Sequence, residues 1–318
     1  MRALLAGLAL LATAPAFAQT TPGIPRAPDG HPDFTGNWAT RIMTPFERPD
    51  GVSDLVVPRD QQAEFIAKNK PKIGEVYDPE FDYAGFTENL LEIDGELRSS
   101  QLIEPADGKL PLTSLAKAII DNFKPSYDEP EMRPGGERCI GGFIDAPIGA
   151  TSFVIPMQIM QTSHNVVLIA EDRDPVRIVS LTGTPLPDEV RSRAGASRGR
   201  WEGDTLVIET DHFAVVDHEG MSFHGDALIT ADSRVIEHFR LFSTDGILYQ
   251  FTVEDPSLYK KPWLAEYTLQ RIPRGIYEYA CHEGNHSIVG ILTAARMGRQ
   301  EEKPKTPDPA SSASAPKP

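Results

Sequence analysis

The densest group of chemically useful side chains in this sequence is a nine-residue segment near the C-terminal end, residues 277–285. The segment supplies a thiol, an imidazole, two carboxylates, two phenols and an amide. Because such groups are costly to bury unless they are paired, their concentration in one place favours a functional site. The residues concerned are Tyr277, Glu278, Tyr279, Cys281, His282, Glu283 and Asn285.

His282 is the best candidate in this segment for a general acid or base. A nearby carboxylate fixes the tautomer of an imidazole, and Glu283 is the adjacent residue. Tyr279 adds a further group that could transfer a proton. In a straight strand, Cys281 and His282 would point to opposite faces, which disfavours a Cys–His nucleophile. A structural hydrogen-bonding role for His282 is the alternative.

A second candidate group lies in the stretch 234–242, where apolar and polar residues alternate as they do in a strand. Glu237 would face one side of this strand and Arg240 the other, and the sequence does not fix which side faces inward. A charged side chain inside a barrel is costly unless it is paired, so the inward-facing residue would belong to a site. Glu237 is therefore a candidate to support His282 in acid–base chemistry.

The sequence gives little support for a metal or an organic cofactor. Residues 282–286 read His-Glu-Gly-Asn-His, with two histidines four apart as in a helical zinc site. Gly284 and Asn285 disfavour the helix that would bring both rings to one face. No P-loop is present, and no GxGxxG pattern opens a helix. We therefore expect no metal and no cofactor, which leaves cofactor-free acid–base chemistry: a lyase, isomerase or hydrolase.

Cys139 and Cys281 are the two cysteines of the chain. In an exported protein the expected arrangement is one disulfide between them. Closing so long a loop contributes on the order of 4 kcal/mol in the chain-entropy description. The alternative is two separate thiols, with Cys281 reactive beside His282.

The N-terminal residues read as an export signal, with a positive Arg2, a short apolar run and small residues before a cleavage point after Ala18. The mature protein is then expected in the periplasm or outside the cell. No later stretch is apolar enough to cross a bilayer. The expected organisation is a signal peptide at 1–18, an extended lead-in at 19–34, one β-rich domain at 35–300, and a disordered Pro/Ala/Ser tail at 301–318.

After residue 150 the chain consists of short runs rich in β-branched and aromatic residues, separated by turn signals. This spacing predicts an antiparallel meander that closes into a barrel of the lipocalin or calycin type, so the expected fold class is mainly β. The first half is loop-rich, with short helices expected at 61–70 and, after a Thr113 cap, at 115–123. The expected strands are 157–170, 176–181, 205–210, 234–242, 248–253 and 265–271.

Gly36-Asn-Trp38 has the pattern with which lipocalin-type barrels begin, where the indole plugs the barrel floor. The alternative is an ordinary core tryptophan. In either case we expect Trp38 to be largely buried, and we expect the same of Trp201.

Several longer motifs resemble those of one family of secreted bacterial proteins. Members carry a hairpin that reads SRGRWEGDTLVVET, a later DP…Y.KPW and a C-terminal YEYACHEGN. The resemblance covers about residues 27–296 and implies common descent, without implying a particular activity. The matching segments here are 27–38, 130–139, 156–161, 197–210, 255–263 and 277–285.

Composition limits the partners. The formal net charge is −15, because 46 Asp and Glu outnumber 31 Lys and Arg, which excludes nucleic acid and anionic membrane as main partners. Barrel pockets are mostly apolar, so the expected partner is a small apolar or aromatic molecule. The sequence does not indicate an oligomeric state. The residues expected to contact the small molecule are Trp201, Arg240, Trp263, Tyr277 and Asn285.

Three functions are consistent with these features. The first is a secreted acid–base enzyme that acts on such a molecule through His282, Glu283, Glu237 and Tyr279. The second is a non-catalytic binding protein that uses the same pocket. The third is a structural or interaction protein of the cell envelope, in which residues 277–285 form only a disulfide-anchored turn.

Overall fold

A computed structural model provides the three-dimensional structure of the chain. The predicted signal peptide and all but the first residue of the predicted tail lie outside the described residues. These are 23–40, 42, 44–69, 89–122, 133, 138–142, 144–150, 155–171, 176–183, 186–215, 222–224 and 227–301.

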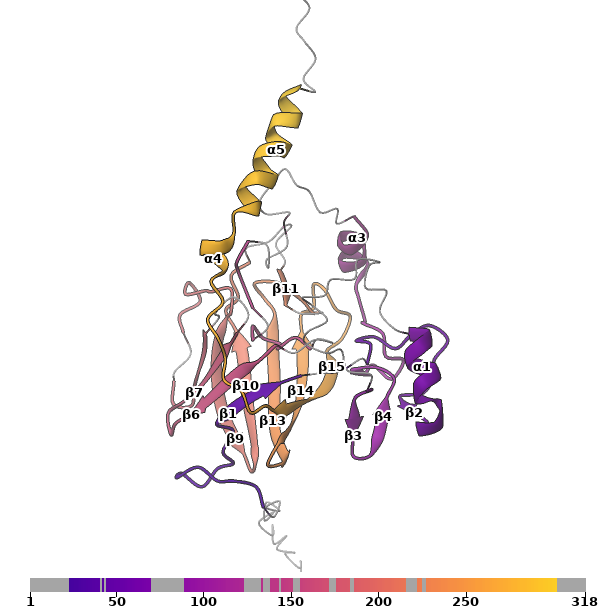
Figure 1. Cartoon of the computed structure of the whole chain (residues 1–318), viewed down its shortest axis with the longest axis vertical. Helices are drawn as coiled ribbons and strands as arrows, with labels where there is room; N and C mark the ends of the chain where they lie inside the picture. Colours follow the sequence, from indigo (N-terminus) through magenta and orange to yellow (C-terminus); the bar gives the residue numbers. More distant parts are fainter. Residues whose placement is uncertain are drawn as a thin grey trace, which may run out of the picture.

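Nine strands form a closed, mixed β-barrel (Figure 1). The barrel closes where the first strand pairs with the last, at Trp38 with Arg271 and Ala39 with Gln270. Neighbouring barrel strands are antiparallel except β8 and β9, which are parallel, so the prediction of a purely antiparallel sheet is corrected at this one pair. Around the barrel the strands are β1 (Gly36–Ala39), β6 (Met157–Gln161), β7 (Asn165–Ala170), β8 (Val176–Ser180), β9 (Ala196–Glu202), β10 (Thr205–Asp211), β13 (Arg234–Ser243), β14 (Gly246–Glu254) and β15 (Trp263–Arg271).

Alternate residues of each strand fill the barrel interior with side chains. On β13, β14 and β15 every second residue is buried among apolar and aromatic neighbours. The rings of Tyr249 and Tyr267 lie 4.8 Å apart, and Trp263 packs edge-on against Phe251. Each such aromatic stabilises the fold by about 1.5–3 kcal/mol through burial, so the barrel is held together mainly by its own contents.

Trp38 is fully buried near the end of the barrel that carries the β13–β14 turn. Its indole N–H donates to the carbonyl of Phe34 at 2.9 Å, and the Arg271 guanidinium lies 4.2 Å from the ring centroid. Arg271 also donates to the carbonyls of Thr35 and Thr244, both at 3.0 Å. The expected burial of Trp38 is therefore confirmed, and its contacts with Phe34 and Arg271 lie at this end of the barrel.

The smaller elements lie beside the barrel. Both predicted helices are present as α1 (Gln62–Asn69) and α3 (Ser114–Asn122), and the Ala116 N–H donates to the Thr113 hydroxyl at 3.1 Å, which confirms the predicted cap. Among the described residues before 272, the other elements are β2 (Val56–Val57), η1 (Arg59–Gln61), β3 (Glu92–Ile93), β4 (Glu96–Arg98), β5 (Leu102–Glu104), β11 (Ser222–His224) and β12 (Ala227–Ile229).

The chain leaves the barrel after β15 and then forms two helices, α4 (Cys281–Gly284) and α5 (Ser287–Glu301). Figure 1 shows α5 projecting away from the barrel. The predicted disulfide is confirmed: Cys139 and Cys281 are bonded, with 5.8 Å between their Cα atoms. Residues 277–285 do not form a strand, because β1 already occupies the barrel edge that β15 would offer them.

Candidate functional site

The C-terminal segment 277–285 lies outside the barrel. His282, Glu283, Tyr277 and Tyr279 are all exposed. No hydrogen bond or ion pair joins the His282 side chain to another described residue. The expected contact with a carboxylate or a tyrosine hydroxyl is therefore missing, and the catalytic role of His282 finds no support in this geometry.

The His-Glu-Gly-Asn-His stretch does not present its two histidines on one helix. Helix α4 ends at Gly284 and α5 begins at Ser287, so His282 lies in α4 and His286 lies in the break between the two helices. Asn285 donates to the Cys139 sulfur at 3.3 Å and accepts from the first turn of α5, which is a capping role. Within the described part of the chain, no group of three or more His, Cys, Asp and Glu side chains could hold a metal ion.

The remaining predicted site residues are divided between the two faces of the barrel wall. Arg240 is exposed on the outside. Glu237 and Trp263 point inward and are fully buried. Trp201 is half-buried rather than largely buried as expected, and its ring stacks on His31 with 4.4 Å between the ring centroids. Of the two strand residues considered from the sequence, Glu237 is thus the one inside the barrel.

The interior contains one buried ion pair, between Glu237 of β13 and Arg177 of β8, among the residues that the structure describes. The Arg177 guanidinium donates to both oxygens of the Glu237 carboxylate. It also donates to the hydroxyls of Ser197 and Thr210, each at 2.8 Å. Tyr249 donates its hydroxyl proton to Glu237 Oε1 at 2.7 Å. We call Arg177, Glu237, Tyr249 and Tyr267 the interior cluster.

Residues 144–148 lie against the interior cluster and bind it through their main chain. The Ile148 N–H donates to the Tyr249 hydroxyl oxygen at 2.8 Å, and the Tyr267 hydroxyl donates to the Ile148 carbonyl at 2.6 Å. Arg177 donates to the Ile144 carbonyl at 3.3 Å. Two phenols and a guanidinium thus hold one peptide segment inside the barrel.

Burial and pairing set the protonation of this cluster. Burial, followed by the nearby Glu237 carboxylate, raises the pKa of Tyr249 well above its ordinary range, so this phenol keeps its proton. Burial alone would lower the pKa of Arg177, but the Glu237 carboxylate holds that pKa above its usual value. At neutral pH Tyr249 is therefore a neutral phenol and Arg177 a cation.

Residues 144–149 also line a cavity together with the barrel wall. Ile144, Ile148 and Gly149 form one side, and Met157 and Leu269 contribute to the other. Its volume is about 10 Å³, room for roughly one water molecule. Sites for drug-sized ligands have volumes of roughly 300–1,000 Å³, so a larger molecule would enter only if residues 144–148 moved.

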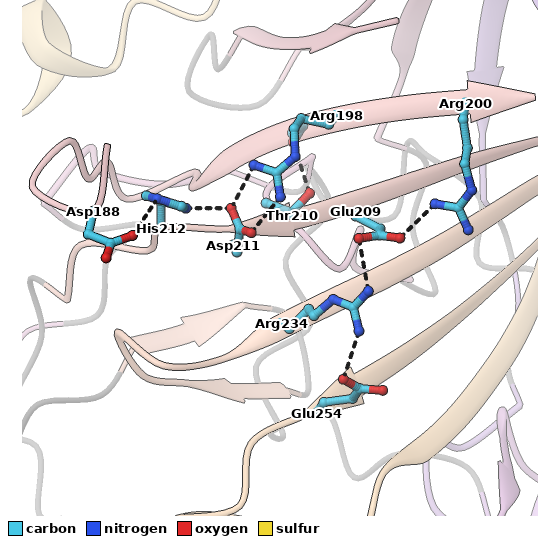
Figure 2. Close-up of polar contacts among 10 residues, drawn as sticks. Asp188, Arg198, Arg200, Glu209, Thr210, Asp211, His212, Arg234 and Glu254 are labelled. Carbon is cyan, nitrogen blue, oxygen red and sulfur yellow. Dashed lines mark hydrogen bonds and ion pairs between the residues drawn. The ribbon is translucent and has the colours of Figure 1, made fainter. Parts of the chain in front are cut away.

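The outer face of β9, β10, β13 and β14 carries a second set of polar contacts (Figure 2). A chain of ion pairs runs Arg200–Glu209–Arg234–Glu254, with distances of 2.6, 2.9 and 3.2 Å. Hydrogen bonds from Arg234 and then Arg200 lower the pKa of Glu209. The arginines and glutamates thus form ion pairs between adjacent strands, as oppositely charged neighbours on a sheet surface do.

His212 lies at the end of β10 in the same view (Figure 2). Its φ of 57° is in the left-handed region, which residues other than glycine rarely adopt. Its Nδ1 is 2.5 Å from Asp211 Oδ1, and Arg198 donates to the other oxygen of Asp211 at 2.6 Å. Burial would raise the pKa of Asp211, but Arg198 and His212 hold that pKa below its ordinary value. The imidazole Nε2 lies 3.6 Å from Asp188, so His212 connects the end of β10 to the segment between β8 and β9.

Sequence reasoning missed Arg177, Tyr249 and Tyr267. Arg177 is in phase with the apolar Val179 of the same strand, so strand parity alone could have placed it inside. Residues 195–199 also match a Gly-x-Ser-x-Gly pattern, which forms a nucleophile elbow only at a strand-to-helix turn. Ser197 instead lies within β9, where its hydroxyl accepts from Arg177.

No protein-family model, curated protein or solved structure matches this chain. No helix among the described residues is long and apolar enough to cross a membrane. The Cys139–Cys281 disulfide is consistent with an oxidising location outside the cytoplasm.

Proposed function

We propose that the protein is an exported binding protein that takes a small, largely apolar molecule into the barrel end now closed by residues 144–148. The observation that carries this proposal is the pairing of the Ile148 peptide with two buried phenols, one accepting at 2.8 Å and one donating at 2.6 Å. A ligand with a neighbouring donor and acceptor could take the place of that peptide. Export with cleavage after Ala18 is part of the same proposal.

The charge of the cluster narrows the ligand class. Arg177 is already neutralised by Glu237, so the cluster offers a ligand no unpaired charge. A carboxylate would gain little there and would lose its hydration. A neutral carboxamide on an aromatic or aliphatic body matches both the phenols and the apolar wall formed by Met157 and Leu269.

Enlarging the cavity tests the proposal. Ile148→Ala keeps the Ile148 main chain and removes side-chain atoms that line the cavity. Binding of aromatic and aliphatic carboxamides is measured by calorimetry, with the corresponding methyl esters for comparison. We expect Ile148→Ala to bind a carboxamide more tightly than the wild type does. Tyr267→Phe in the Ile148→Ala background should weaken binding by about 2- to 10-fold, the worth of one hydrogen bond.

Leu258→Ala is the matched control, because Leu258 is equally buried but lies away from the cavity. It should leave carboxamide binding at the wild-type level. Failure of every carboxamide to bind Ile148→Ala, or equal gains in Leu258→Ala, would count against an interior site.

Acid–base catalysis in the same site is the second candidate, favoured by the 2.7 Å hydrogen bond from Tyr249 to Glu237. It places a carboxylate base next to a phenol that keeps its proton. If a bound molecule is turned over, Glu237→Gln should lower kcat by about 10²- to 10⁴-fold, whereas His282→Ala should not change it. Unchanged turnover in Glu237→Gln would exclude Glu237 as the base, and absence of turnover in the wild type would leave binding as the function.

A further inference from the structure

The outer face of β6, β7 and β8 is apolar and uncharged. Met160, Val176 and Ile178 point outward with 37, 53 and 62 % of their surface exposed, and Val167 and Ile169 are half-buried between them. We call these five residues the neutral face. Strand register places Met160, Val167 and Ile178 in one row, and Ile169 beside Val176 in the next.

Within the three strands the outward polar residues carry no charge either, and two charged residues at the border, Arg198 beside Ser180 and Glu171 after β7, are paired with Asp211 and Arg274. The other outward positions of the three strands are Gln158, Asn165 and Ser180. An apolar centre without charges, surrounded by a polar rim, is the usual composition of a protein–protein interface. Contiguous apolar patches on adjacent strands mark interaction sites more often than isolated exposed residues do.

We propose that the neutral face binds a second copy of this chain, in a two-fold dimer in which the β6–β8 walls of two barrels pack face to face. The chain has a net charge of −15, so two copies repel each other over most of their surfaces. Repulsion is weakest where neither copy carries charge. A two-fold axis through the neutral face brings apolar rows together and requires no complementary charge.

Position in the fold leaves this wall accessible. In Figure 1, β6 and β7 lie on the side of the barrel away from the small sheet β2–β4 and helix α1. A strongly basic or acidic partner would gain nothing from a face without charges. The proposal is independent of the ligand site, because Arg177 and Val179 face the interior while Val176 and Ile178 face outward.

Sedimentation velocity over a concentration series of the purified chain tests the proposal. We expect a reversible monomer–dimer equilibrium in the wild type. Ile178→Glu places a carboxylate from each copy at the centre of the interface, so the dissociation constant should rise by at least about 10-fold. Val176→Glu should act in the same direction. Both side chains are exposed, so the melting temperature of the monomer should stay close to that of the wild type.

Phe242→Glu is the control, since Phe242 is an exposed apolar residue of β13, outside the neutral face. It makes the same change in charge and should leave the equilibrium unaltered. The proposal is overturned if the wild type is monomeric at all concentrations, if Ile178→Glu leaves a dimer intact, or if Phe242→Glu dissociates it equally. A monomer that binds phosphatidylethanolamine–phosphatidylglycerol vesicles through Ile178 would also overturn it, in favour of a lipid surface.

Discussion

The outer wall of the barrel differs between its two halves. On β9, β10, β13 and β14, arginine and glutamate side chains alternate across strands and pair with one another (Figure 2). On β6, β7 and β8 the outward positions are apolar or uncharged. Both halves use the same strand geometry and the same apolar interior, so folding alone does not require this contrast. A charged wall keeps an acidic protein soluble, whereas an uncharged wall remains available for contact.

The interior cluster joins the two halves. Arg177 belongs to the uncharged half and Glu237 to the charged half, and their side chains meet across the barrel interior. Buried ion pairs seldom stabilise a fold more than apolar residues would, yet losing one partner is costly. Substitutions inside the barrel are therefore expected to change the free energy of unfolding more than substitutions on its outer walls.

The largest effect is expected from breaking the interior pair. Glu237→Leu leaves the buried Arg177 guanidinium without its carboxylate and the Tyr249 hydroxyl without its acceptor. We expect the free energy of unfolding to fall by about 3–5 kcal/mol, measured by urea denaturation. The double variant Arg177→Met/Glu237→Leu should recover most of the loss, since Ser197 and Thr210 remain hydrogen-bonded to each other at 2.9 Å. Equal losses in the single and double variants would contradict this account.

The alternation of side chains along a strand determines how much of the barrel could be predicted from the sequence. Alternation predicted β8, β10, β13, β14 and β15, because one buried face imposes a period of two. It treated β6 and β7 as one run, 157–170, and β9 was not among the expected strands. It could not reveal that β8 and β9 are parallel, because pairing direction depends on how the barrel closes. The same parity left Glu237 and Arg240 undecided, since each lies beside an apolar residue of the opposite face.

The C-terminal segment was harder to predict for another physical reason. Residues 277–285 contain the types of an active site, but composition does not report exposure. Only closure of the barrel by β1 and β15 decides that this segment has no sheet edge to join. The interior cluster could not be recognised for the opposite reason. Its members are spread from residue 177 to residue 267, and only the fold brings them together.

A smaller effect is expected from pH, and it should come from the charged half. The folded-state pKa values of Asp211 and Glu209 lie below their ordinary values because arginines donate to both carboxylates. Groups with lowered pKa values stabilise the fold above their unfolded pKa, about 4, and lose that contribution as pH falls through the folded-state value. Urea denaturation between neutral pH and pH 3 should therefore show Asp211→Asn/Glu209→Gln losing less stability on acidification than the wild type does. If the free energy of unfolding falls equally in the double variant and the wild type, other carboxylates determine the loss of stability at low pH.

The smallest effect is expected from a single exposed charge. Arg234→Gln removes the cation between Glu209 and Glu254, and exposed pairs of this kind contribute about 0.2–1 kcal/mol each. The loss should shrink when salt is raised, because screening weakens both the ion pairs and the repulsion that their removal leaves between carboxylates. Both variants are compared with the wild type by urea denaturation at low and high salt.

Ile178→Thr, on the uncharged half, is the control, and its effect on the free energy of unfolding should not depend on salt. If both variants respond equally to salt, the two walls do not differ electrostatically. A salt response confined to Arg234→Gln would assign the surface electrostatics to the charged half alone.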